Sequence, residues 1–387
     1  MDEKTEKFAL VLDIGTTGIK SFVFNEAFGI VAKSYKHIDE INLHRGHVEQ
    51  DPRDILKLAI EAIRDAVKNS GILTENILGM AITNQRESVV AWDKKTSWPF
   101  YPAILWKDVR TEEYCARFSD ADRKKIKQKT GLSIEPYFSA SKINWLLNNV
   151  PEVKTAMKEN CLACGTLDSW LLWNISEEKN FLTDQTNASR ALLFNIREKK
   201  WDEDLFEFFE IPREIVSEVY ESKSNFGNLK KEIIGRTLPI VGICGDQQAS
   251  LYAAGKTIGT TKITYGTGTF IMQITGKEFV LNENFFTTLS VDGDYVFEAK
   301  VNHGGEEVEL ILNDNEKLLK YLKNLAQETD FYVKKLPQKP AEIIIDGGVM
   351  RDGILKKYQE EISQVSIKEQ MIFDGTALGA AKLVFEQ

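Results

Sequence analysis

The chain has 387 residues, of which 43% are hydrophobic and 28% are charged, and its formal net charge is −9. This length and balance are typical of a globular protein with two or three domains of about 150 residues. The acidic charge, without a long block of one sign, argues against nucleic acid and anionic membranes as partners. No apolar run approaches the roughly 18 residues of a membrane helix, and the polar start MDEKTEKF is unlike a signal peptide. We therefore expect a cytoplasmic protein without membrane insertion.

The chain opens with a strand and a Gly/Thr-rich turn. Residues 8–12 form an apolar strand, the turn DIGTTG follows from Asp13 to Gly18, and residues 19–25 and 29–37 continue as strands. Taken alone, this turn is a weak signal for a phosphate loop, because a tight hairpin in which Asp13 satisfies the turn explains it.

A helix and a buried strand come next. Asp51 as N-cap and Pro52 at the first helical position predict a helix that ends before Gly71. The strand over residues 77–83 then leads into NQRE, residues 84–87. An adjacent Arg and Glu are ordinarily a solvated pair, but after a buried strand a ligand-binding role is an equal alternative.

Helical patterns dominate the following hundred or so residues. They cover residues 111–118, 121–129, 139–149, 166–173 and 202–209, with a loop at 134–138. Trp106 and Tyr137 lie in this part, where such aromatics are more often core residues than ligand contacts. Cys161 and Cys164 have CxxC spacing without a second pair, so we interpret them as small buried hydrophobes rather than as a redox or zinc site.

The central stretch, residues 239–270, contains a strand-end carboxylate and a second Gly/Thr turn. The apolar strand 239–244 precedes Asp246, and a helix-prone run follows, which is where open α/β sheets bind ligands. The later turn Gly266-Thr267-Gly268 lies between two strands and offers N–H groups to an anion such as phosphate. A base that orients a hydroxyl and donors that hold phosphates are what phosphoryl transfer to a hydroxyl requires.

The last third repeats the order of the first. Strands are expected at 286–291, 295–301, 342–345 and 366–372, and helices at 306–325 and 353–362. Gly347 and Gly348 form a strand-to-helix turn of the kind that admits a nucleotide closely. Gly379, with two alanines after it, leaves room for a close helix crossing. The β-β-β-α-β-α-β-α order therefore occurs twice, which predicts a duplicated domain with phosphates held between the copies.

Several motifs resemble those of the FGGY family of carbohydrate kinases, and within it the branch that phosphorylates glycerol. They are NQRE, GHVEQDP, EPYFSASK, TDQTNASRALLFNI, GDQQASL and YGTGTF. The resemblance implies an α/β fold of two actin-like (ribonuclease-H-like) domains, residues 1–253 and 254–387, with the active site in the cleft between them. It also implies ATP-dependent phosphorylation of glycerol to sn-glycerol 3-phosphate, with ATP and Mg²⁺ as cofactors.

The resemblance implies roles for individual residues as well. Asp246 is the expected general base, and Asp13 is expected to meet Mg²⁺ through water. The residues expected to bind the substrate are Arg86, Glu87, Trp106, Tyr137, Asp246, Gln247 and Phe270. Those expected to bind the nucleotide are Thr16, Thr17, Gly18, Lys20, Thr267, Gly304, Gly348 and Asp352.

The chain departs from the family pattern mainly on the nucleotide side. Lys20 replaces the usual arginine, which keeps a cation but loses the bidentate fork. Val308 stands where glutamine is common, and Asp352 where asparagine is common. The stretch between residues 312 and 342 is also much shorter than in the family.

Three hypotheses follow for the function. The chain is a glycerol-phosphorylating enzyme, a non-catalytic or regulatory paralogue that binds glycerol or a nucleotide, or an FGGY kinase for another small polyol or sugar. The complete set around Asp246 favours an enzyme, and the altered nucleotide side favours the paralogue. A homodimer is compatible with each of them.

Overall fold

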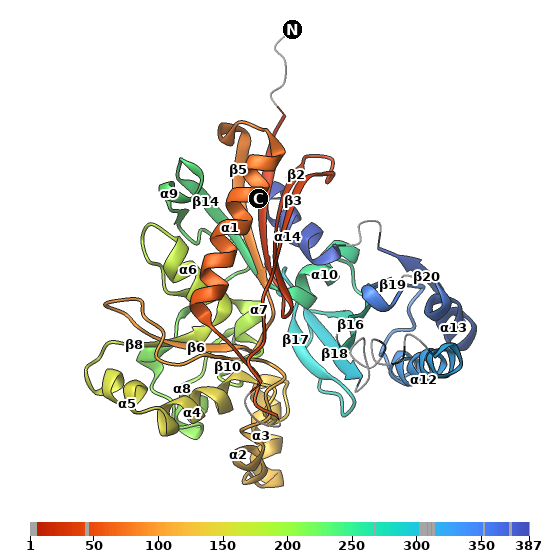
Figure 1. The fold of residues 1–387 in the computed structure, drawn as a ribbon. Helices are drawn as coiled ribbons and strands as arrows, with labels where there is room; N and C mark the ends of the chain where they lie inside the picture. Colours follow the sequence, from red (N-terminus) through yellow and green to blue (C-terminus); the bar gives the residue numbers. More distant parts are fainter. Residues whose placement is uncertain are drawn as a thin grey trace. The chain divides into compact units, whose positions relative to one another are not determined.

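The computed structural model describes residues 6–42, 46–266, 268–301, 308, 311, 314–350, 353–370 and 374–386. The chain divides into two compact units, which are described separately (Figure 1). The first consists of Met1–Asp246 and Ala380–Gln387, and the second of Gln247–Gly379. The predicted division after residue 253 separates family domains rather than compact units, and it stays a prediction.

The first unit is built on a six-stranded sheet. In spatial order its strands are β13 (Asn228–Leu229), β14 (Leu238–Gly245), β5 (Ile77–Asn84), β1 (Phe8–Ile14), β2 (Gly18–Asn25) and β3 (Ile30–His37). The strands β1, β2 and β3 pair antiparallel, whereas β5 and β14 join them in parallel pairings. The carboxyl ends of β1, β5 and β14 consequently lie at one edge of the sheet.

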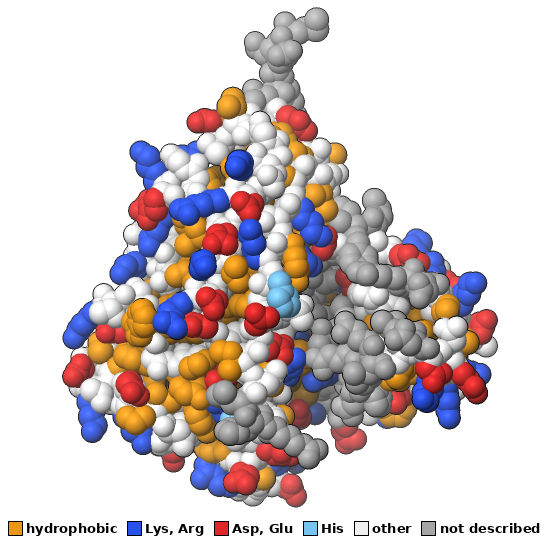
Figure 2. All heavy atoms as spheres, viewed as in Figure 1, with side chains coloured by type: hydrophobic (Ala, Val, Ile, Leu, Met, Phe, Trp, Pro, Cys, Tyr) orange, Lys and Arg blue, Asp and Glu red, His pale blue; other side chains and the backbone are white. Residues whose placement is uncertain are grey.

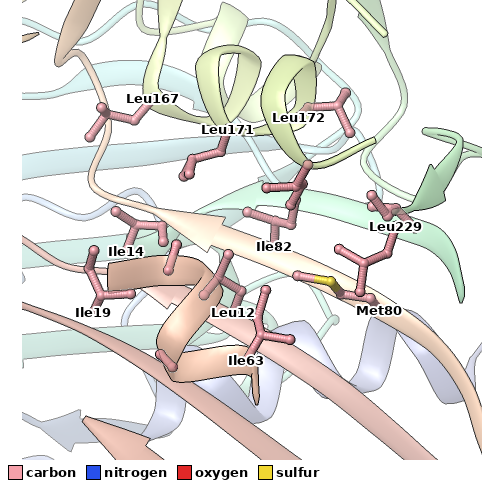
Figure 3. Packing of buried hydrophobic residues seen from close by; sticks show 14 of the residues in the cluster. Leu12, Ile14, Ile19, Ile63, Met80, Ile82, Leu167, Leu171, Leu172 and Leu229 are labelled. Atoms are coloured by element: carbon pink, nitrogen blue, oxygen red, sulfur yellow. The ribbon is translucent and has the colours of Figure 1, made fainter. Parts of the chain in front are cut away.

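A long helix, α1 (Pro52–Ser70), packs against β2 and β3 and closes the core. Its start is the predicted one: the Asp51 side chain accepts a hydrogen bond from the Arg53 amide, and Gly71 ends the helix with φ 65°. Its buried stripe meets the apolar strand residues shown in Figure 3, where Ile63 lies near Leu12 and Met80. Burying each such side chain contributes about 1.5–3 kcal/mol, so this core fixes the strand ends beside it.

Around this core lie smaller elements of the first unit. A four-stranded sheet has the order β4 (Glu49–Gln50), β7 (Ala103–Ile104), β6 (Val89–Asp93) and β8 (Leu162–Thr166). Two further pairs are β10 (Phe194–Asn195) with β11 (Lys200–Trp201), and β12 (Glu218–Tyr220) with β9 (Leu182–Asp184). The helices are α2 (Glu112–Ala116), α3 (Asp120–Thr130), α4 (Ser139–Asn149), α5 (Pro151–Lys158), α6 (Leu167–Ile175), α7 (Gln185–Ala188), α8 (Glu203–Phe208) and α9 (Lys231–Ile234), with 3₁₀ turns η1 (Thr74–Asn76) and η2 (Arg213–Ile215). Cys161 and Cys164 are buried free thiols, as interpreted from the sequence.

Five strands of the second unit repeat the arrangement of five strands in the first. Its sheet runs β17 (Phe286–Leu289), β18 (Tyr295–Val301), β16 (Thr269–Gly276), β15 (Thr261–Tyr265), β19 (Glu342–Asp346) and β20 (Ser366–Glu369). The strands β15, β16 and β18 pair antiparallel, and β19 and β20 follow in parallel. Antiparallel β1–β2–β3 followed by parallel β5 and β14 is the same arrangement, which confirms the predicted duplication.

The helices that the described residues form in the second unit or at its borders are α10 (Asp246–Ala254), which begins at the last residue of the first stretch of unit one, α12 (Asn315–Val333), α13 (Ile354–Ser363) and α14 (Gly375–Phe385), which continues into the first unit, with the 3₁₀ turn η3 (Gly348–Met350). Of the helix predicted over 306–325, residues 308 and 311 are helical, and the other residues of 306–313 lie outside the described residues. The helix α12 covers the remainder from Asn315 and continues to Val333, and the Asp314 side chain caps its start by accepting from the Lys317 amide. The strand predicted over 366–372 ends at 369, and residues 371–373 lie outside the described residues.

The last helix, α14, makes close contacts in both units. A Cβ at Gly379 would lie 1.8 Å from the Ala249 carbonyl oxygen on α10, which confirms the close helix crossing expected at this glycine. The residues after Gly379 belong to the first unit, where a Cβ at Gly242 of β14 would lie 2.7 Å from the Cβ of Leu383. Phe385 meets the ring of Phe28 edge-on, with centroids 5.6 Å apart.

The surface carries charges of both signs. Figure 2 shows Lys and Arg side chains interspersed with Asp and Glu over the visible face. Among the described residues, no helix combines the length and apolar character needed to cross a membrane.

Candidate active site

Arg86 and Glu87 lie directly after β5, and both are buried, each 2% exposed. The alternative of an ordinary solvated pair is therefore excluded. Glu87 has φ 62°, a left-handed backbone conformation that is uncommon for residues other than glycine. Such local strain persists only where the surroundings hold it, and it is concentrated at functional sites.

Asp246 lies beside this pair because two parallel strands end together. The last residue of β14, Gly245, is in register with Asn84, the last residue of β5. Asp246 follows as the first residue of α10, and its Oδ1 is 3.4 Å from Nε of Arg86. The Asp246 side chain is 28% exposed, so the carboxylate is held by a buried cation and remains open on one side. That arrangement suits a group that accepts a proton from a bound hydroxyl.

Trp106 and Tyr137 form an aromatic pair in the first unit. The rings of Trp106 and Tyr137 meet edge-on at 5.9 Å, and both residues are only partly buried, so they are not simply core residues. The indole Nε1 of Trp106 donates a hydrogen bond of 2.9 Å to Oγ1 of Thr16. Trp106 thereby connects the predicted substrate residues to the first Gly/Thr turn.

One hydrogen bond closes the first Gly/Thr turn, and another links it to β4. The Gly15 amide donates to the Gly18 carbonyl over 3.0 Å, and the Thr16 carbonyl accepts from Nε2 of Gln50 over 2.7 Å. Asp13 and Lys20 are register partners on β1 and β2, with Nζ of Lys20 at 3.8 Å from Asp13 Oδ2. The turn therefore presents a carboxylate and a cation side by side.

A buried polar network holds the two strand ends in place. Asp184 accepts hydrogen bonds from the hydroxyls of Thr186 and Ser222 at 2.7 and 2.6 Å, and Oγ1 of Thr186 accepts from the Gly245 amide at 2.8 Å. The side chains of Asn84 and Asn187 exchange amide hydrogen bonds of 3.0 and 3.1 Å. Burial raises the pKa of Asp184, although the hydroxyl and amide donors oppose this. The residue before Asp246 is thus fixed from the interior.

Arg190 and Lys142 are two buried cations at this site that the sequence interpretation missed. Arg190 is fully buried, donates from Nε to Oε1 of Glu87, and lies 5.2 Å from the ring centroid of Tyr137. Lys142 donates to the carbonyls of Pro136 and Tyr137 at 2.8 and 2.6 Å, and burial lowers its pKa to about 8. A signal was available for Arg190, because it directly precedes the apolar run ALLF, where a buried charge needs a partner.

Replacing Arg190 by methionine is expected to lower the free energy of unfolding by about 3–5 kcal/mol, since the buried Glu87 would lose its hydrogen-bonded cation and keep Arg86, whose Nε is 4.0 Å from its Oε1. Equilibrium urea unfolding measures this. The matched control is Arg213→Met, because Arg213 also lies over two aromatic rings and pairs with a carboxylate, but near the surface. The control should lose about 1 kcal/mol. Equal losses in the two variants would show that the buried Arg190–Glu87 pair contributes no more to stability than the surface pair of Arg213.

The remaining predicted residues belong to the second unit or lie outside the described residues. Gln247 and Phe270 are nearly buried, 9% and 8% exposed. Thr267, Gly304 and Asp352 lie outside the described residues. The second Gly/Thr turn is closed like the first, with the Gly266 amide donating to the Gly268 carbonyl over 3.1 Å.

The Gly347-Gly348 turn packs directly on the strand that precedes the second Gly/Thr turn. Gly347 has φ 108°, and a Cβ there would lie 2.2 Å from the Tyr265 carbonyl oxygen, so only glycine fits. A Cβ at Gly348 would meet nothing within 4 Å, which leaves its backbone open to a ligand. Val308 is 8% exposed and belongs to the apolar cluster of Ile263 and Tyr265, so the residue that departs from the family pattern serves the core.

Comparisons with known proteins identify the family of the chain. A family model described as the N-terminal domain of the FGGY family of carbohydrate kinases matches residues 8–253. The chain is 40% identical to a glycerol kinase of Aquifex aeolicus over 330 residues, covering 84% of this chain and 65% of that protein. For a glycerol kinase of Clostridium botulinum the identity is 39% over 340 residues, which cover 86% of this chain and 67% of that protein. The chain belongs to the FGGY family of carbohydrate kinases, and it spans about two thirds of the length of these relatives.

Solved structures show the same fold over the whole chain. A crystal structure of Plasmodium falciparum glycerol kinase with ADP matches with a TM-score of 0.89 and 27% identity, covering 98% of this chain and 89% of that chain. A xylulose kinase from Rhodospirillum rubrum matches with a TM-score of 0.86 at 16% identity, which shows the fold alone. The predicted family and the predicted α/β fold of two actin-like domains are confirmed.

Proposed function

We propose that the chain phosphorylates glycerol to sn-glycerol 3-phosphate with ATP as the phosphoryl donor. The observation that carries the proposal is the position of Asp246 beside buried Arg86, with one side of the carboxylate exposed. The similarity to glycerol kinases of two bacteria, at 39–40% identity, supports glycerol as the substrate. Phosphoryl transfer depends mainly on positioning and electrostatics, for which this fixed constellation is suited.

The substrate roles follow from the chemistry of the side chains. Arg86 donates to glycerol hydroxyls and Glu87 accepts from them, with Gln247 as a further polar contact. Tyr137 helps to hold the hydroxyls, and Trp106 and Phe270 cover the carbon chain and exclude water. Asp246 takes the proton from the hydroxyl that attacks the γ-phosphoryl group. The edge-on aromatic pair at 5.9 Å supports an apolar wall next to the carboxylates.

The nucleotide and metal roles rest on the two Gly/Thr turns. We assign phosphate and nucleotide contacts to Thr16, Thr17, Gly18, Lys20, Thr267, Gly304, Gly348 and Asp352. Mg²⁺ keeps most of its waters and binds through one or two carboxylates together with substrate phosphates, so a single carboxylate such as Asp13 fits it. When bound, the ion neutralises charge on the phosphates. Asp13 lies near the end of β1 and is 7% exposed, and we assign it a contact with the ion through water.

We further infer a glycerol-binding domain over residues 1–253 and a nucleotide-binding domain over 254–387. The end of the family match at residue 253 supports this division. ATP as donor favours the cytoplasm as the compartment. A homodimer stays a prediction.

The non-catalytic paralogue is the second candidate, because the chain is shortened on its nucleotide side and Val308 serves the core there. A coupled ADP-release assay with glycerol, other polyols and ketoses separates the candidates. ADP release above background with glycerol supports the proposal. Release only with another polyol or sugar would support the third hypothesis. Glycerol binding by calorimetry without any ADP release would support the paralogue.

The nucleotide is expected to bind weakly while glycerol binds normally. Each missing neutral hydrogen bond is worth about 0.5–1.5 kcal/mol, so several together would weaken ATP binding by about tenfold to several hundredfold. With few adenine contacts left, GTP should replace ATP readily. Calorimetry of each ligand alone measures this, with the Aquifex aeolicus glycerol kinase titrated alongside as the longer reference. Tight and adenine-selective ATP binding would contradict the prediction.

A further inference from the structure

Asp346 connects three elements of the second unit. It is the last residue of β19 and directly precedes the Gly347-Gly348 turn. Its Oδ1 lies 2.5 Å from Nζ of Lys262 on β15, and its Oδ2 accepts a hydrogen bond of 2.8 Å from the Ser250 hydroxyl on α10. Both carboxylate oxygens are thus engaged, each by a different element.

The surroundings leave these side chains little freedom. Lys262 and Ser250 are each 1% exposed, and Nζ of Lys262 also donates to Oγ1 of Thr264 at 2.8 Å. A Cβ at Gly375, the first residue of α14, would lie 2.8 Å from Oδ2 of Asp346. A larger residue at 375 would therefore displace the carboxylate.

Stability alone does not explain a buried ion pair at this position. Desolvation of two charges costs about as much as their attraction returns, so apolar residues of similar volume would serve a core equally well. The best-attested use of such pairs is to fix one arrangement among several. Here the arrangement that is fixed is that of the glycine turn relative to α10.

The helix α10 connects the carboxylate contact to the proposed base, because Asp246 is its first residue and Ser250 lies one turn further on. A contact that holds Ser250 therefore also restrains the position of Asp246. The glycine turn, for its part, is assigned to the nucleotide, and its backbone at Gly348 is open.

We propose that Lys262, Asp346 and Ser250 form a positioning triad that couples occupancy of the Gly347-Gly348 turn to the placement of Asp246. The inference rests on the proposed function and extends it to communication between the two ligands. A nucleotide on the turn fixes Asp346, Asp346 holds Ser250, and α10 then presents Asp246 in one position. None of the three residues is assigned a contact with either ligand.

The test compares Ser250→Ala with wild type by calorimetry of glycerol, with and without saturating Mg·ADP. Allosteric couplings are typically 5–150-fold in affinity, so wild type should bind glycerol at least about fivefold more tightly with Mg·ADP. In Ser250→Ala this factor should fall below about twofold, with each ligand alone binding within about threefold of wild type. The kcat should fall at least about tenfold, because small displacements of a reacting group can cost about 10²-fold in rate.

Two further variants separate positioning from folding. Ser290→Ala is the matched control: Ser290 is also a nearly buried serine of the second unit with one hydrogen bond, accepted from the Asp294 amide. It should keep the wild-type coupling and kcat. Ser250→Thr retains the hydroxyl and should restore most of the coupling that Ser250→Ala loses.

The outcomes distinguish this inference from the proposed function. Wild-type coupling in a folded Ser250→Ala variant would overturn the inference and leave the kinase proposal intact. Loss of coupling in Ser250→Ala, in a protein that never releases ADP, would support the triad and overturn the kinase proposal. Absence of any nucleotide binding by wild type would overturn both.

Discussion

Replacement of Asp246 by asparagine is expected to lower kcat by about 10²–10⁴ while glycerol still binds, because general-base assistance is worth that much in rate. An amide keeps the shape of the carboxylate and part of its hydrogen bonding, so the glycerol Kd should change less than kcat. The Arg86 guanidinium, 3.4 Å from the carboxylate, would then face a neutral group and remain buried. Steady-state ADP release and calorimetry on the same preparation measure the two quantities.

A matched control for this variant is Asp202→Asn. Asp202 is also an aspartate at a helix start with a cation beside it, since it caps α8 and lies 2.9 Å from Nζ of Lys129. Its loss should affect stability and leave kcat unchanged. Turnover close to wild type in Asp246→Asn would remove Asp246 from the mechanism.

Glycerol is expected to be preferred over propanediols and five-carbon ketoses by up to about 10⁴ in kcat/KM. A site whose buried groups pair with substrate hydroxyls rejects ligands that leave those groups unpaired. Arg86 and Glu87 are buried groups of this kind, each 2% exposed, so a missing hydroxyl removes a hydrogen bond that water cannot readily replace. The partly buried Trp106 and Tyr137 limit the space for a longer chain.

The measurement is kcat/KM for glycerol, 1,2-propanediol, 1,3-propanediol, xylulose and ribulose under identical conditions. The two propanediols act as controls for each other, because each lacks a different hydroxyl. More efficient phosphorylation of xylulose or ribulose would show that the glycerol assignment is wrong while membership of the FGGY family stands.

Much of the scaffold could be predicted from the sequence because its signals are local. Asp51 and Pro52 marked the start of α1, and the repeated β-β-β-α-β-α-β-α order predicted a duplicated domain. The predicted end at residue 325 was wrong, since α12 continues to Val333.

The sequence indicated which residues belong to the site better than it indicated how those residues are arranged. Arg86 and Asp246 are far apart in sequence, and they meet only because β5 and β14 pair in the register that joins Asn84 to Gly245. Pattern alone predicts the strands but not that register. Arg190 was missed for a related reason: its contact with Glu87 depends on how distant elements pack, which no local pattern encodes.

Because α14 returns to the first unit, the second unit is an insertion within the first unit and not a C-terminal extension of it. The backbone leaves the first unit after Asp246 and re-enters it at Ala380, where Leu383 covers Gly242 of β14. A fragment that ends at residue 246 would therefore lack part of its own interior. Conversely, a deletion within this insertion leaves both connections between the units in place. The first unit can then keep its connectivity while the second varies in length. The short stretch between residues 312 and 342 lies within this insertion.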